Sequence, residues 1–192
     1  MELDDTHWAT LHQLRLRGMM LVDAFEFHEQ AAAAEIVRVR GNYVALTDTG
    51  RALHAEWARV PDGSEGYEAA ARLHDGFHAL NVELLTICTA WQVRPTGATN
   101  DHSDAKYDWD VIDSLERLHE RAAPRMRRVA RDIPRFDGYD RRLRTALKRV
   151  IDDGEHEWFA SPRVDSYHTL WNHFHEDLLL ALGRDRADEP QP

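Results

Sequence analysis

The sequence contains one cysteine and no long apolar run, and both features limit what the protein can be. A single cysteine, Cys88, excludes an intrachain disulfide framework. No uninterrupted apolar stretch approaches the roughly 18–20 residues that a bilayer-spanning helix needs. The acidic, polar N-terminus does not resemble a signal peptide. We therefore expect a cytoplasmic protein without a membrane partner.

Motifs of several enzyme classes are also missing. The chain has neither the G-x-S-x-G turn of serine hydrolases nor a glycine-rich phosphate loop. Lysine occurs only at Lys106 and Lys148, against 22 arginines, a bias typical of bacterial genomes rich in G and C. The composition, 43% hydrophobic and 30% charged residues, is that of an ordinary globular protein.

Charge is unevenly distributed along the chain. The net charge is −10, yet residues 121–149 contain eleven basic and three acidic side chains, a local charge of +8. Two interpretations of this segment are open: a solvated arginine face on helices, or a surface that binds an anion or nucleic acid.

The first sixty residues combine helical and extended patterns. Three helices are predicted, over residues 6–17, 20–34 and 47–60. Thr47 can cap the third helix. Before it come two β-prone runs, 36–40 and 43–46, joined by Gly41-Asn42, which favours a two-residue hairpin.

This order of elements resembles a winged-helix domain of the bacterial transcription-regulator type. The string Leu46-Thr47-Asp48-Thr49-Gly50-Arg51 matches the L-T-x-x-G-R that often follows the wing. The resemblance implies DNA as a partner, read by a helix in the major groove. Here only 16 residues separate Gly18 from Glu35, enough for one helix, and none is arginine or lysine. We infer a truncated recognition helix, so DNA stays open as a partner but is disfavoured, and the alternative is a scaffold for packing or dimerisation.

After the turn-rich segment 61–66, the chain is predicted to be helical. The expected helices cover 67–91, 107–123, 125–131, 139–150 and 166–183. The segment 92–106, which contains Asp101, His102 and Asp104, is interpreted as a plain loop. Strings such as Asn100-Asp101-His102 and Val164-Asp165-Ser166-Tyr167-His168 resemble an actinobacterial helical domain found behind winged-helix segments.

The predicted fold class is therefore mainly α. We expect a shortened winged-helix domain with one β-hairpin over 1–60, an all-α helical bundle over 67–186 that binds a ligand, and a tail over 187–192.

Histidines lie on apolar helix faces in this second region. At about 100° per residue, His168, Trp171 and His175 share one side of helix 166–183. The same periodicity predicts inward positions for a histidine, a carboxylate and an amide on two other helices. The candidate acid–base residues are His168, His175, His119 and Asp108, and the candidate ligand-binding residues are Asn81, Trp91, Tyr167 and Trp171.

A metal ion or an organic molecule would satisfy such buried side chains. His168 and His175 are two helical turns, about 10.5 Å, apart, so both cannot bind one ion at ligand distances near 2 Å. A metal is therefore not favoured, and no cofactor is specified. A pocket for a small organic molecule is the better interpretation.

Three functional hypotheses follow. The first is a regulator-like protein, expected to be a homodimer, whose helical domain senses a small molecule. The second is an enzyme on the same scaffold that uses the pocket histidines and Asp108 for acid–base chemistry, of the isomerase, cyclase or lyase type, in specialised metabolism. The third is a structural or partner-binding protein with hydrogen-bonded core histidines.

Overall fold

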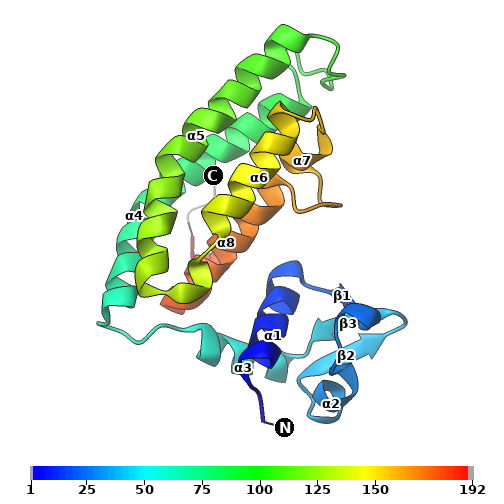
Figure 1. Ribbon diagram of the computed structural model, residues 1–192, viewed down its shortest axis with the longest axis vertical. Coiled ribbons are helices and arrows are strands. Elements are labelled where there is room, and N and C mark those ends of the chain that lie inside the picture. The colour runs from blue at the N-terminus through cyan, green and yellow to red at the C-terminus, as the bar shows by residue number, and fades with distance from the viewer. Residues whose placement is uncertain (1, 190–192) are drawn as a thin grey trace. The chain divides into compact units, whose positions relative to one another are not determined.

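The computed structural model describes residues 2–189 (Figure 1). The chain is mainly helical with a small antiparallel sheet near the N-terminus, which confirms the predicted fold class. It divides into two compact units. Residues 2–60 with Leu179–Asp188 form the N-terminal unit, and Pro61–Leu178 with Glu189 form the helical unit. No helix within the described residues has both the length and the apolar character needed to cross a membrane.

Local capping explains the first and third helices of the N-terminal unit. α1 (Asp5–Arg17) begins after Asp4, whose carboxylate accepts a hydrogen bond from the His7 amide at 2.9 Å. α3 (Asp48–Ala58) begins after Thr47, whose hydroxyl accepts from the Gly50 amide at 3.0 Å.

The predicted hairpin lies between these helices. β2 (Val37–Arg40) pairs with β3 (Tyr43–Leu46), and Gly41 in the turn has a φ of +56°. That positive angle is the reason a glycine is needed at the first turn position.

The predicted helix over 20–34 is wrong. Instead, β1 (Met20–Leu21) pairs with β3 to give the sheet order β1-β3-β2, and η1 (Val22–Ala24) and α2 (His28–Ala33) follow. The Val22 amide donates to the Asn42 carbonyl at 2.9 Å, and Phe25 is fully buried between η1 and α2. Sheet pairing and the burial of Phe25 therefore override the local helical preference.

The core of the N-terminal unit contains eight buried apolar residues: Leu11, Leu14, Phe25, Ala31, Ile36, Val37, Val44 and Leu46. Gly50 lies against the edge of this core, because a Cβ atom added there would be 2.0 Å from the Ile36 carbonyl oxygen. The glycine of L-T-x-x-G-R is thus required by the close approach of α3 to the chain entering β2.

Two helices of 28 residues, α4 (Glu65–Gln92) and α5 (Ala105–Asp132), lie side by side along the helical unit (Figure 1). α4 continues through Gly76. α5 continues through Pro124, where the sequence predicted an end, because Ala122, Ala123 and Met126 around it are buried. Packing of this face offsets the hydrogen bond that proline cannot donate.

The remaining elements are η2 (Pro134–Phe136), α6 (Tyr139–Ile151), α7 (Glu157–Ala160), α8 (Tyr167–Leu182) and η3 (Arg186–Asp188). α8 is buried on more than its predicted face, since His173 and Phe174 are buried as well as Trp171 and His175. Of the predicted tail 187–192, residues 190–192 lie outside the described residues.

Candidate functional site

The three predicted histidines each have different neighbours in the helical unit. His119, on α5, is 2% exposed, and its Nδ1 lies 3.3 Å from the Tyr167 hydroxyl oxygen on α8. Its Nε2 is buried and has no hydrogen-bond partner among the described residues. Burial lowers the pKa of His119 to about 4, and the positive charge of Arg144 acts in the same direction. Burial also raises the pKa of Tyr167. Both groups are therefore neutral near pH 7, and the pair is part of the packed core.

His168 and His175 lie farther along α8. His168 is half-buried, its Nε2 is 3.3 Å from Nδ2 of Asn172 on the next turn, and burial lowers its pKa. His175 is buried, with its Nε2 2.9 Å from Glu189 Oε2, and the same carboxylate lies 3.1 Å from His74 Nε2. Burial raises the pKa of Glu189, but hydrogen bonds and charge from His175 and His74 lower it overall. His175 therefore holds Glu189 in place.

Asn81 and Trp171 form a direct pair. The indole Nε1–H of Trp171 donates to Asn81 Oδ1 at 3.1 Å, and the ring stacks on Phe77 with 4.9 Å between centroids. Because Trp171 is fully buried, Asn81 satisfies a donor that would otherwise be unpaired in the core.

The two remaining predicted residues, Trp91 and Asp108, come together where α4 ends and α5 begins. The loop 93–104 joins these helices, and α7 lies at the same end of the unit (Figure 1). Asp104 caps α5 by accepting from the Tyr107 amide at 3.1 Å, so Asp108 lies one turn into the helix, next to the loop. Arg94 fixes the loop by donating to Asp104 at 3.0 Å.

Asp108 holds His102 in a defined orientation. Asp108 is 5% exposed; its Oδ1 accepts from Asn100 Nδ2 at 2.8 Å, and its Oδ2 lies 3.1 Å from His102 Nδ1. Asn100 also donates to the Trp91 carbonyl oxygen at 3.1 Å, which uses its second amide hydrogen. A carboxylate only accepts hydrogen bonds, so the hydrogen between the two groups is assigned to His102 Nδ1. In a ring with that one proton, Nε2 is an acceptor.

His102 has an unusual backbone conformation. Its φ of +59° lies in the left-handed region, which only a few per cent of non-glycine residues occupy. The surrounding hydrogen bonds maintain it, including one from the His102 amide to Asn100 Oδ1 at 3.4 Å. Backbone strain held in this way is concentrated at ligand-binding and catalytic sites.

The His102 ring lines a pocket of about 390 Å³. The lining comes from the end of α4, the loop and the region of α7: Trp91, Gln92, Thr99, Asn100, His102, His156, Glu157, Ala160, Ser161 and Pro162. The His156 ring is 4.8 Å from that of His102 and 5.2 Å from that of Trp91. Trp91 also stacks on Phe159 at 4.2 Å. This volume is within the range of small-molecule sites, roughly 300–1,000 Å³.

Sequence analysis missed Asn100, His102 and His156. One signal was available for the first two, because a good N-cap at Asp104 requires Asp108 to lie in the first turn beside the preceding loop. No local pattern places His156 there, since α7 meets the loop only through tertiary packing.

No protein-family model, curated protein or solved structure matches this chain. Within residues 2–189, no group of three His, Cys, Asp or Glu side chains is arranged to hold a metal ion. The chemistry of the site comes from an oriented imidazole, a second imidazole and an aromatic wall.

Proposed function

We propose that the protein is a regulator-like protein whose helical unit binds a small organic molecule in the pocket beside His102. The observation that carries this proposal is the Asp108–His102 pair, which presents an imidazole acceptor in a pocket lined by Trp91 and His156. A ligand with a planar apolar group suits the aromatic lining, and an O–H or N–H donor suits Nε2 of His102. The lining does not include His119, His168 or His175.

The proposal can be tested with phenol and indole fragments on ¹⁵N-labelled protein. We expect amide shifts confined to residues 91–104 and 156–162, and binding about tenfold weaker in His102→Asn, where asparagine tolerates the left-handed backbone. His78→Asn, at an exposed histidine of α4 outside the lining, is the matched control and should bind like the wild type. If the fragments bind His102→Asn and His78→Asn equally well, and the amide shifts lie outside these two segments, this pocket is not the binding site.

A second candidate function is acid–base catalysis in the same pocket. A carboxylate-oriented imidazole is suited to removing a proton, and His156, 4.8 Å away between ring centroids, is suited to returning one. Isomerisation by a proton shift needs only such transfers. In an elimination the returned proton goes to the departing group, and in a cyclisation it goes to the atom that gains negative charge as the ring bond forms. To separate the two functions, a ligand that binds is incubated for a long time with the wild-type protein and with His102→Asn. Mass spectrometry then shows whether the ligand has been converted. Conversion that depends on His102 supports an enzyme, and a ligand recovered unchanged supports a sensor.

The N-terminal unit supports a regulator-like origin without sequence-specific DNA reading. The sheet order β1-β3-β2 followed by α3 is compatible with a winged-helix arrangement, but α2 has only six residues, HEQAAA, and none is arginine or lysine. We infer that this unit acts through protein contacts, and that the protein is a homodimer.

Exposed apolar side chains support that inference. Met19, Leu21, Val39 and Tyr43 are 41–58% exposed in or beside the sheet. Light scattering in solution tests the dimer, and a mass equal to the 22.2 kDa of one chain would contradict it.

A further inference from the structure

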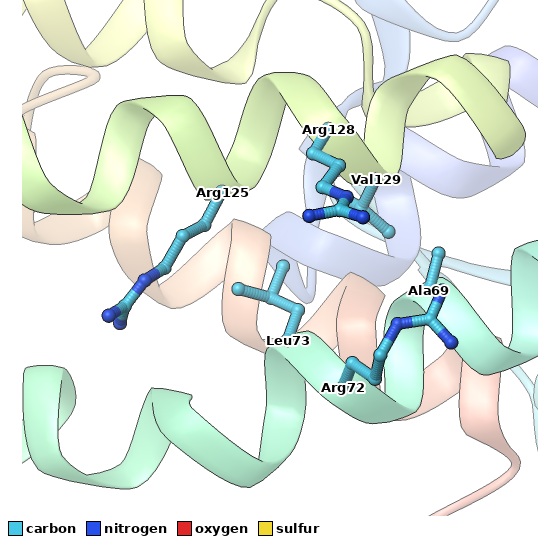
Figure 2. Close-up of a pocket in the computed structure, with 6 residues that line it drawn as sticks. All are labelled: Ala69, Arg72, Leu73, Arg125, Arg128 and Val129. Carbon is cyan, nitrogen blue, oxygen red and sulfur yellow. The ribbon is translucent and has the colours of Figure 1, made fainter.

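A second pocket, of about 160 Å³, lies between α4 and α5. Three arginines and three apolar residues line it: Arg72, Arg125, Arg128, Ala69, Leu73 and Val129. Figure 2 shows Arg72 extending from α4 and Arg125 and Arg128 from α5. At 1.5 Å per residue, Arg72 is about 28 Å along α4 from Trp91, so this pocket and the His102 pocket are separate sites.

Other arginines in the basic part of the chain have carboxylate partners. Five of them form ion pairs: Arg121 with Glu83, Arg127 with Asp140, Arg135 with Asp177, Arg142 with Asp165 and Arg149 with Glu155. Within residues 2–189 the guanidinium groups of Arg72, Arg125 and Arg128 form no hydrogen bond or ion pair. Arg131, Arg141 and Arg144 also have none there, but only the first three line this pocket. The lining of the pocket also contains no carboxylate.

The chemistry of this lining is that of an anion site. Three like charges around a small space repel one another, and a bound anion converts that repulsion into attraction. Ala69, Leu73 and Val129 are buried and form an apolar base, which lowers the local dielectric and strengthens the attraction. The planar guanidinium fork matches two oxygens of a phosphate group at once.

Size determines which anion the pocket accepts. Its volume of about 160 Å³ is below the roughly 300–1,000 Å³ of typical small-molecule sites, so it suits one tetrahedral oxyanion better than a whole nucleotide. The net charge of −10 opposes binding of an extended nucleic-acid backbone. We propose that the pocket binds a single phosphoryl group, either as free phosphate or as the terminal group of a small phosphorylated molecule that extends into solvent.

Calorimetric titration with inorganic phosphate and with phenyl phosphate, at constant ionic strength, tests this proposal. We expect saturable binding of at least one of the two, and the tighter one identifies the source of the phosphoryl group. Arg125→Gln and Arg128→Gln should each weaken binding about tenfold, the effect of losing one charge-assisted hydrogen bond. Arg131→Gln removes the same charge from the same helix but lies outside the lining, so it should change affinity less than about twofold.

Thermal unfolding shows whether the variants are folded. Phosphate should raise the melting temperature of the wild type and of Arg131→Gln, and should leave that of Arg128→Gln nearly unchanged. The proposal is overturned if neither phosphate compound binds in the millimolar range, or if Arg131→Gln weakens binding as much as Arg128→Gln. A short DNA duplex that binds more tightly than phenyl phosphate, and loses affinity in the same variants, would also overturn it by assigning the arginines to nucleic acid.

Discussion

The orientation of His102 depends on a single buried carboxylate. Asp108 accepts from Asn100 with one oxygen and faces His102 Nδ1 with the other, so one side chain both closes the loop and selects the ring tautomer. His119 differs from His102, because it is buried in the core beside the Tyr167 hydroxyl and no carboxylate within residues 2–189 orients it in this way.

Replacing Asp108 with asparagine tests this arrangement. The asparagine amide group would place a donor opposite the donors of Asn100 and His102. We therefore expect Asp108→Asn to lower the free energy of unfolding by about 1–3 kcal/mol. We also expect it to weaken fragment binding at the pocket. Urea denaturation and NMR titration measure the two effects. Asp110→Asn is the control, because Asp110 is 64% exposed and pairs with the exposed Lys106, so it should change stability by less than about 0.5 kcal/mol.

The pKa of His119 leads to a prediction about stability and pH. Its folded pKa of about 4 lies below the ordinary value of 6.5, so the unfolded chain takes up this proton more readily. The stabilisation is complete above about pH 6.5 and is lost as the pH falls towards 4. Between pH 7 and pH 5 the wild type should therefore lose about 2 kcal/mol relative to His119→Gln, measured by urea denaturation. His78→Gln, at an exposed histidine, should produce no such difference, and an equal difference would contradict the assignment.

Among the elements, α3 shows how a short motif specifies packing. Thr47 caps the helix, its amide donates to the Ile36 carbonyl at 3.0 Å, and Gly50 lets that carbonyl approach the helix. The L-T-x-x-G-R string is therefore explained by contacts inside the N-terminal unit, independently of any DNA.

Two glycine-to-alanine changes provide a matched test. In Gly50→Ala the new Cβ would lie 2.0 Å from the Ile36 carbonyl oxygen, so the helix must shift, and we expect a loss of about 3 kcal/mol or more. In Gly76→Ala the nearest neighbour of the new Cβ would be an Arg125 nitrogen at 3.7 Å, and alanine should stabilise α4 by about 0.5–1 kcal/mol. If denaturation curves show that both variants change the free energy of unfolding in the same direction, close packing at Gly50 does not explain the effect of the substitution there.

For the molecule as a whole, two separate pockets in one helical unit are consistent with a protein that responds to small molecules. The aromatic pocket lies where α4 meets α5, and the arginine pocket lies far along the same helices. The N-terminal unit has a three-stranded antiparallel sheet and a six-residue α2.

We expect no sequence-specific complex with DNA. In a gel-shift assay at low salt with the gene's own upstream region, the absence of arginine and lysine from α2 should leave the DNA unshifted, with or without cell extract to supply a ligand. A complex that survives excess non-specific competitor would contradict this expectation.

Elements whose signals are local could be predicted from the amino-acid sequence. Capping residues and periodicity predicted α1, α3, α6 and the hairpin, because each depends on hydrogen bonds within a few residues. The same reasoning failed at 20–34 and at Pro124, where sheet pairing and core packing outweigh local preference.

The contacts between polar residues far apart in the chain depend on tertiary packing. Asp108 and Trp91 were predicted from helix faces, but their partner His102 depends on how the loop folds back, and His156 depends on the docking of α7. Arg72 joins Arg125 and Arg128 only because α4 packs against α5. A helical period specifies which side of a helix faces inward, whereas the partner across that interface is fixed by packing between segments far apart in the chain.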